Sequence, residues 1–100
     1  MAAYTLVCSA RNSRPILRQT IGAAEDTVTV SAISMRRNGA RIQMVTTTSG
    51  LLFTTTAGTA LANGFPVIAG QALTLWFPDG AQFYVAGTVA GFIDYLVVEE

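Results

Sequence analysis

The sequence predicts an all-β fold, a compact antiparallel β-sandwich or barrel of about seven to eight short strands with an irregular N-terminal arm. Val, Ile and Thr contribute nine, six and thirteen of the 100 residues, and side chains branched at Cβ fit a pleated sheet better than a helix. In residues 27–32, polar and apolar residues alternate strictly, which is typical of a strand with one buried face. No long segment has the 3.6-residue period of an amphipathic helix.

The length of the chain predicts a single domain. One hundred residues are close to the usual size of one domain, and folding at that size removes roughly two thirds of the surface of the extended chain. We assign residues 1–26 to an N-terminal strand and arm, and residues 27–100 to the β core of the same domain. The uncharged residues 80–93 include three Gly and are too few to cross a membrane as a helix, so we expect no membrane partner.

Seven candidate strands follow one another along the chain, each bounded by turn residues. In chain order they span residues 4–9, 27–32, 41–47, 51–56, 72–77, 82–86 and 92–98. After the first strand, the arginines of residues 11–24 have helical spacing, but Pro15 and Gly22 would break any helix within a few turns. We therefore interpret residues 11–24 as an irregular arm.

Three short turns predict hairpins between successive strands. Residues 38–39 (Asn-Gly) are the pair preferred at the centre of a type I′ turn, because both tolerate positive φ. Residues 78–80 (Pro-Asp-Gly) predict a second hairpin, and residues 49–50 (Ser-Gly) predict a third. Residues 58–70 are then a long ordered connection of the kind that Greek-key folds contain.

The expected core consists of apolar residues spaced two apart on the candidate strands. Trp76 and Phe77 are neighbours in one strand and must point to opposite sides, so one large aromatic side chain is expected to be exposed. Asp94 shares its predicted face with apolar residues, and a buried carboxylate there would need an Arg partner from the first half of the chain. The predicted core comprises Val28, Val30, Ile42, Met44, Leu73, Leu75, Phe83, Val85, Leu96 and Val98.

Charged residues are few and unevenly distributed. They make up 12% of the chain against 51% hydrophobic residues, which is about half the usual charged share of a soluble domain. All six Arg lie at or before Arg41 with two carboxylates, a net +4, whereas the remainder has four carboxylates and no cation, a net −4. Two interpretations stay open: the asymmetry orients like subunits head to tail, or it disappears when folding brings the ends together.

The residue types exclude most catalytic chemistry. The chain has no Lys and no His, which removes Schiff-base catalysis, the P-loop lysine and every histidine-dependent triad. The single Cys8 cannot form an intrachain disulfide, and the ligands for a zinc site are missing. Asp79 and Asp94 remain as a candidate glycosidase pair, although Asp79 is better explained as a turn residue. We therefore expect no enzyme, no metal and no cofactor.

The candidate binding residues are side chains suited to contact with another protein. Arg guanidinium groups form bidentate hydrogen bonds with carboxylates of a neighbouring subunit, and exposed aromatic residues mark interfaces. Formal neutrality and the lack of interleaved exposed aromatic residues disfavour nucleic acid as a partner. The Thr triplets at residues 46–48 and 54–56 either offer a hydroxyl ladder to sugar or ice or simply stabilise a sheet. The predicted subunit or shell contacts are Arg11, Arg14, Arg18, Arg36, Arg37 and Trp76.

Five short motifs lie between residues 36 and 100. They are residues 41–43 (Arg-Ile-Gln), 63–67 (Asn-Gly-Phe-Pro-Val), 70–75 (Gly-Gln-Ala-Leu-Thr-Leu), 83–86 (Phe-Tyr-Val-Ala) and 94–99 (Asp-Tyr-Leu-Val-Val-Glu). With these motifs, residues 36–100 resemble a small all-β type common among structural proteins of tailed bacteriophage particles. The first 35 residues depart from that pattern.

The resemblance implies a compact sandwich that decorates capsids or sits in head, fibre-base or tail assemblies, commonly as a trimer or larger ring, with no active site. A mean hydropathy of +0.46 agrees, because copies of the same chain most simply cover a weakly polar surface. We therefore expect a noncatalytic capsid decoration protein of the virion, assembled in the host cytoplasm, whose partners are its own copies and the major capsid protein or another virion protein.

The alternative function is a receptor- or carbohydrate-binding module of a phage tail fibre, or another component of a head or tail assembly. Such a module would use Trp76, Tyr84 or the Thr ladder to stack on sugar or to hydrogen-bond with it. A glycan array separates this alternative from capsid decoration.

Overall fold

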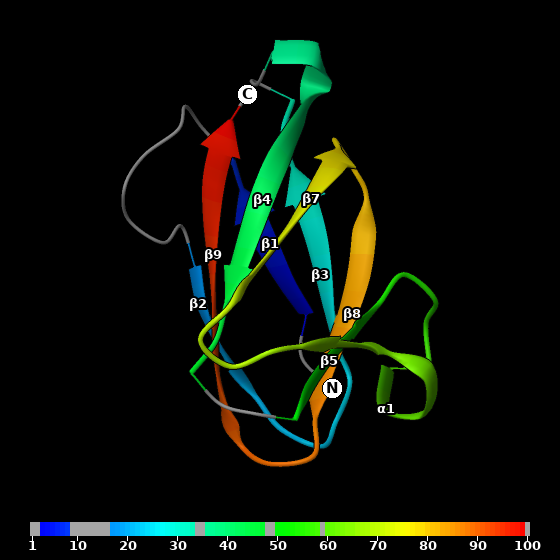
Figure 1. Ribbon diagram of the computed structural model, residues 1–100. Helices are drawn as coiled ribbons and strands as arrows, with labels where there is room; N and C mark the ends of the chain where they lie inside the picture. Colours follow the sequence, from blue (N-terminus) through cyan, green and yellow to red (C-terminus); the bar gives the residue numbers. More distant parts are fainter. Residues whose placement is uncertain (1–2, 9–16, 34–35, 48–49, 59, 100) are drawn as a thin grey trace.

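The computed structural model describes residues 3–8, 17–33, 36–47, 50–58 and 60–99, and within them nine β-strands form two packed sheets (Figure 1). A turn of 3-10 helix, η1 (Arg36–Asn38), precedes β4, and a short helix, α1 (Ala60–Asn63), lies between β5 and β6. The strands are β1 (Ala3–Val7), β2 (Leu17–Ile21), β3 (Asp26–Ser31), β4 (Gly39–Val45), β5 (Leu51–Thr54), β6 (Phe65–Val67), β7 (Ala72–Pro78), β8 (Gln82–Gly87) and β9 (Gly91–Glu99). The predicted all-β sandwich is confirmed.

The two sheets have different sizes and strand orders. One is a five-stranded sheet in the order β1-β3-β8-β5-β6, and the other is a four-stranded sheet in the order β2-β9-β4-β7. β1 runs parallel to β3, whereas the other pairs of strands are antiparallel. Strands β6 and β7 therefore end the two sheets, as β1 and β2 do on the opposite side.

Most connections carry the chain from one sheet to the other, so neighbours in sequence are rarely neighbours in a sheet. β3 and β4, β4 and β5, and β7 and β8 each lie in different sheets. The hairpins predicted at residues 38–39, 49–50 and 78–80 are therefore wrong. The turn residues at these places do not reveal the sheet of the next strand, because a hairpin and a corner between sheets use the same turn chemistry.

The corner between β7 and β8 shows this clearly. The Ala81 amide donates a hydrogen bond to the Pro78 carbonyl oxygen at 3.1 Å, and Gly80 adopts a φ of 85°. The turn is thus present where the sequence predicts it. The Asp79 carboxylate accepts a hydrogen bond from the Ala32 amide at 2.8 Å. This bond fixes the corner to the end of β3, which belongs to the other sheet from β7.

The core between the sheets contains most of the residues predicted for it. Leu73 and Leu75 are only half-buried, because β7 lies at the edge of its sheet. The alternation in residues 27–32 correctly predicts the inward face of β3, where Ala32 is buried as well. The predicted core residues that are fully buried are Val28, Val30, Ile42, Met44, Phe83 and Val85.

β9 turns the opposite set of side chains into the core from the set predicted. Leu96 and Val98 are half-buried. The alternate positions are fully buried: Ile93, Tyr95 and Val97. Residues 93–98 are apolar or aromatic except for Asp94, so apolar spacing does not choose the face. The face is chosen by Asp94, whose carboxylate must stay at the surface, since burial of a charge is costly.

Part of the predicted irregular arm is a strand. Leu17–Ile21 forms β2 and pairs with residues 91–95 of β9, so residues 17–21 correct that interpretation, while residues 11–16 lie outside the described residues. Gln19 and Ile21 point into the core. Because the polar Gln19 interrupts the apolar alternation on the inward face, the sequence pattern does not indicate a strand here. The long connection of residues 58–70 likewise contains α1 and β6.

A buried polar network links the two sheets. The Tyr95 hydroxyl donates to Oε1 of Gln19 at 2.8 Å, and Nε2 of Gln19 donates to Oδ2 of Asp26 at 3.2 Å. Tyr95 and Gln19 belong to the four-stranded sheet and Asp26 to the five-stranded sheet. Burial raises the pKa of Tyr95 far above its usual value, so the hydroxyl stays protonated as a donor.

Gly39 is required for packing, which differs from the role predicted for it. Positive φ occurs one residue earlier than expected, at Arg37 (64°) and Asn38 (50°), while Gly39 begins β4 and is buried. A Cβ atom on Gly39 would clash with Cζ2 of Trp76. The absent side chain therefore makes room for the indole ring.

Replacing Gly39 with Val is expected to lower the free energy of unfolding by about 1 to 3 kcal/mol, because the new side chain overpacks against Trp76. Urea unfolding measures this loss. The same substitution in a Trp76→Ala background should cost clearly less. An equal loss in both backgrounds would show that the indole ring is not the obstacle.

Candidate functional site

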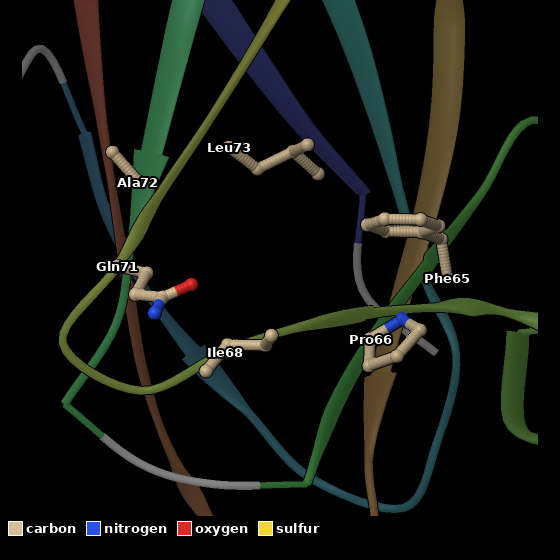
Figure 2. A pocket seen from close by; sticks show the side chains of 6 residues that line it. All are labelled: Phe65, Pro66, Ile68, Gln71, Ala72 and Leu73. Atoms are coloured by element: carbon tan, nitrogen blue, oxygen red, sulfur yellow. The ribbon is translucent and has the colours of Figure 1, made fainter.

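The sandwich is open on one side, between the terminal strands β6 and β7 of the two sheets. An apolar hollow of about 240 Å³ lies there, lined by Phe53, Phe65, Leu73 and Leu75. A second hollow of about 190 Å³ is lined by Phe65, Pro66, Ile68, Gln71, Ala72 and Leu73 (Figure 2). We call β6, β7 and the residues lining these two hollows the open edge.

Core side chains reach the surface at the open edge. Leu73 and Leu75 are half-buried, whereas the residues paired with them on β4 are fully buried. Phe65 and Ile68 are 59% and 57% exposed. In Figure 2 the Leu73 side chain extends from β7 toward the Phe65 ring. The inward row of β7 thus lacks the cover that a further strand would give it.

The segment that builds the open edge contains no charged residue. Every residue from 42 through 78 is uncharged, and this stretch includes β5, α1, β6 and β7. Among the described strands, β7 pairs with β4 alone, and an edge strand presents unpaired amide and carbonyl groups on its free side. The open edge is therefore suited to apolar contact and backbone hydrogen bonding, and poorly suited to binding ions.

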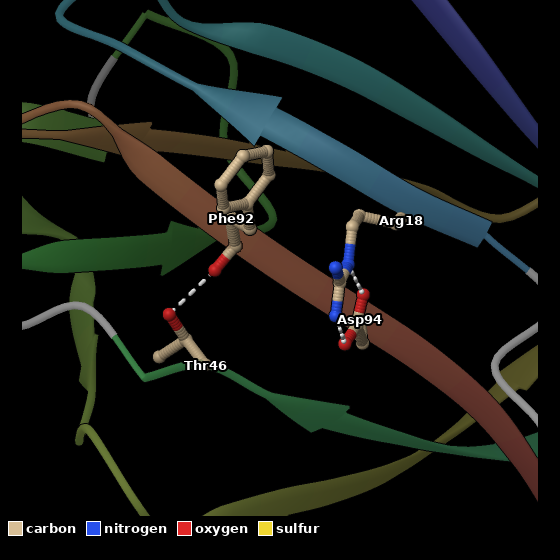
Figure 3. Close-up of polar contacts among 4 residues, drawn as sticks. All are labelled: Arg18, Thr46, Phe92 and Asp94. Carbon is tan, nitrogen blue, oxygen red and sulfur yellow. Dashed lines mark hydrogen bonds and ion pairs between the residues drawn. The ribbon is translucent and has the colours of Figure 1, made fainter.

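A second polar cluster lies on the outer face of the four-stranded sheet (Figure 3). Nε and Nη2 of Arg18 donate to the two carboxylate oxygens of Asp94 at 2.8 and 2.9 Å. The guanidinium carbon also lies 5.5 Å from the centre of the Phe92 ring, and Thr46 Oγ1 donates to the Phe92 carbonyl oxygen at 2.6 Å. The predicted Arg partner of Asp94 is thus confirmed, although the pair lies at the surface.

The Arg18–Asp94 pair also bears on the charge asymmetry. It joins a cation from the positive half of the chain to a carboxylate from the negative half. Folding therefore brings opposite charges together at this point, as the second interpretation of the asymmetry requires. A hollow of about 120 Å³ lies beside this pair, lined in part by Arg18, Thr47 and Asp94. Because Asp94 already occupies the fork of the guanidinium group, this hollow offers little to an anionic ligand.

Replacing Asp94 with Asn should remove a pH-dependent part of the stability. Arg18 holds the pKa of Asp94 below its usual value, so the pair stabilises the fold above the ordinary aspartate pKa of about 4 and loses this effect as the pH falls. The difference in unfolding free energy between wild type and D94N should shrink in acid and in high salt, as urea unfolding can measure. A difference that is constant across pH would contradict this role.

The two carboxylates considered for glycosidase chemistry lie far apart. The Asp79 amide donates to the carbonyl oxygen of Asn38, next to the start of β4, whereas Asp94 pairs in register with Val45 at the end of β4. Six residues of strand separate these ends, which corresponds to about 20 Å. Glycosidase carboxylates lie about 5 to 9.5 Å apart, so these two do not form such a pair.

The predicted contact residues do not form one site. Arg18 lies on β2 and Trp76 on β7, at opposite edges of the four-stranded sheet. Arg37 is exposed in η1, two residues before Gly39, against which Trp76 packs. Trp76 is 38% exposed and Phe77 is buried, which confirms that the two aromatic residues point to opposite sides.

Three of the predicted contact residues are described only in part or not at all. Arg11 and Arg14 lie outside the described residues, and Arg36 is described only as the first residue of η1.

The described part of the chain contains no group of three or more Cys, Asp or Glu residues placed to hold a metal ion. No helix within the described ranges is long and apolar enough to span a bilayer.

The comparisons with known proteins leave the family open. Family models, curated proteins and solved structures were compared with the chain, and none matches it. The resemblance to phage virion proteins therefore rests on the sequence motifs alone.

Sequence reasoning missed the residues that matter most at the open edge. Phe65, Pro66 and Ile68 fall in the segment interpreted as a long connection, and Leu73 and Leu75 were expected to be fully buried. The uninterrupted absence of charge from residue 42 to 78 is the signal that could have identified this surface, because soluble edge strands usually carry a charge that prevents pairing.

Proposed function

We propose that this chain is a noncatalytic structural protein of a virion, a capsid decoration protein that binds the shell and its own copies. The observation that carries the proposal is the open edge, an apolar, uncharged surface at the side of a sandwich. Contiguous apolar surface of this kind is typical of sites of protein contact. The resemblance of residues 36–100 to phage structural proteins indicates that the particle is the virion of a tailed bacteriophage.

A second surface supports binding to an acidic neighbour. Arg37 is exposed and adopts a positive φ in η1, which is a strained backbone for a residue with a long side chain. Its position before β4 places the residue at one end of the sandwich, away from Arg18 and Asp94. A guanidinium group there can form a bidentate pair with a carboxylate of the shell.

The carbohydrate-binding alternative has less support from the geometry. Trp76 and Tyr84 lie on the outward faces of different sheets, so they cannot stack on one sugar. Thr46 is buried and hydrogen-bonded to the Phe92 carbonyl oxygen, which removes it from an exposed hydroxyl ladder. A glycan array tests the alternative, and saturable binding to one sugar would favour it.

The test of the proposal is co-sedimentation with purified, undecorated capsid shells of tailed bacteriophages. We expect the wild type to pellet with the shells to a fixed ratio, and the Arg36→Gln/Arg37→Gln variant to bind more weakly while remaining folded. The effect of the double substitution should diminish at high salt. Equal binding by the variant over a range of salt concentrations would remove the two Arg from the interface, and no binding by the wild type would reject the proposal.

A further inference from the structure

We infer that the open edge is a twofold docking site for a second copy of this chain, in which β7 pairs antiparallel with β7 of the copy. This inference rests on the proposed function only in so far as that function includes binding between copies. It goes further by naming the strand that pairs, the side chains that become covered and the symmetry of the contact.

The backbone of β7 is suited to pairing with a further strand. β7 is seven residues long and, among the described strands, hydrogen-bonds to β4 alone. Its single Pro is the last residue, so the preceding amide groups remain available on the free side. Natural edge strands usually prevent such pairing with a charge, a bulge or a short length. β7 has no charged residue and pairs with β4 without a register shift.

The inward side chains of β7 are incompletely buried. Leu73 and Leu75 point inward like Phe77, yet they are half-buried while Phe77 is buried. A strand added to the free side of β7 would continue the four-stranded sheet and cover this row. It would also close the apolar hollow in which Leu73 faces Phe65 (Figure 2).

Symmetry and the absence of charge favour a copy of the chain as the occupant. Antiparallel pairing of a strand with its own copy is the arrangement that a twofold axis produces, and it places like residues close together. Any charge near that axis would repel itself, but residues 42–78 carry none. A register centred on Leu75 sets Leu73 beside Phe77 of the copy and Thr74 beside Trp76 of the copy, so apolar residues meet apolar residues on the inward face.

This symmetry gives a different copy number from the trimer or larger ring that the resemblance implies. A twofold contact closes with two copies, so the open edge alone gives a dimer. A trimer or larger ring would require a different, head-to-tail contact. The inference therefore predicts a solution dimer as the unit that meets the shell.

The experiment compares the same substitution on the two edge strands of the four-stranded sheet, in the full chain. Thr74→Lys places a charge on β7, and Thr20→Lys places the same charge on β2, where Thr20 is exposed. Sedimentation velocity over a range of concentrations should show a wild-type dimer. We expect T74K to raise the dimer dissociation constant about tenfold or more, because the two added charges lie close to the axis, and T20K to leave it unchanged.

A charge-reversal mixture gives a readout that misfolding cannot produce. T74K and T74E should each be largely monomeric, and their mixture should recover the dimer. Wild-type protein that is monomeric at every concentration, or T74K that dimerises as the wild type does, would overturn the inference. If wild type is monomeric but T74K alone loses binding to shells, the edge binds another protein and self-pairing is also rejected.

The two proposals fail separately in these measurements. A dimer that T74K disrupts but that never co-sediments with shells would reject capsid decoration and retain the β7 contact. Shell binding by a monomer, unaffected by T74K, would reject the β7 contact and retain capsid decoration.

Discussion

Replacing Phe83 with Ala is expected to lower the free energy of unfolding by about 3 to 5 kcal/mol, a large part of the roughly 5 to 15 kcal/mol that stabilises a typical domain. Phe83 is fully buried. Its ring lies 4.9 Å from Phe77, 5.3 Å from Phe53 and 5.8 Å from Tyr95, measured between ring centres. These rings come from both sheets, so the truncation leaves a cavity where the sheets meet.

Phe92→Ala is the matched control for this prediction. Phe92 is 49% exposed on the outer face, and its loss removes an exposed contact with Arg18 and no core packing, so we expect less than about 1 kcal/mol. Urea unfolding of both variants measures the difference. Similar losses for F83A and F92A would contradict the arrangement of aromatic residues between the sheets.

Replacing Gln19 with Leu is expected to cost about 2 to 4 kcal/mol, although it makes the core more apolar. The substitution removes the acceptor of the Tyr95 hydroxyl and a donor to the Asp26 carboxylate, two hydrogen bonds at buried positions. A buried polar group that loses its partner costs about 1 to 3 kcal/mol, and bonds to charged groups are at the upper end.

Gln82→Leu is the control for the Gln19 substitution. The Gln82 amide also donates a hydrogen bond, at 3.2 Å to Thr29, but at an exposed position where water can replace it, so the cost should be about 0.5 kcal/mol or less. The Gln19→Leu/Tyr95→Phe double variant should lose less than the sum of the two single variants, because both act on one network. Strict additivity would argue against that coupling.

The inward face of β3 could be predicted because its sequence is unambiguous. Polar and apolar residues alternate in residues 27–32, and only one register buries the apolar set. In β9 nearly every residue is apolar, so the pattern permits either face. Asp94, which must stay at the surface, and Tyr95, whose hydroxyl points inward, decide which face of β9 is buried. Local patterns thus predict a strand better than they predict its orientation when both faces are apolar.

The topology and the candidate site depended on contacts that no local pattern contains. Turn residues at 78–80 mark a change of direction but not the sheet that the chain joins next. β2 was missed because Gln19 is polar, and its burial is explained only by Tyr95 from the far end of the chain. The open edge likewise arises from two strands of different sheets, and single segments do not reveal that their exposed apolar residues meet.

The most direct test of the central claim, that this protein functions by assembly, is its mass in solution measured by light scattering with and without purified undecorated shells. We expect the mass of the isolated protein to rise with concentration toward that of two chains, and added shells to remove the protein from the free fraction at a fixed ratio. Binding of the folded form should also raise the unfolding temperature. A protein that remains a monomer at every concentration, leaves the shells bare and binds a glycan does not function by assembly.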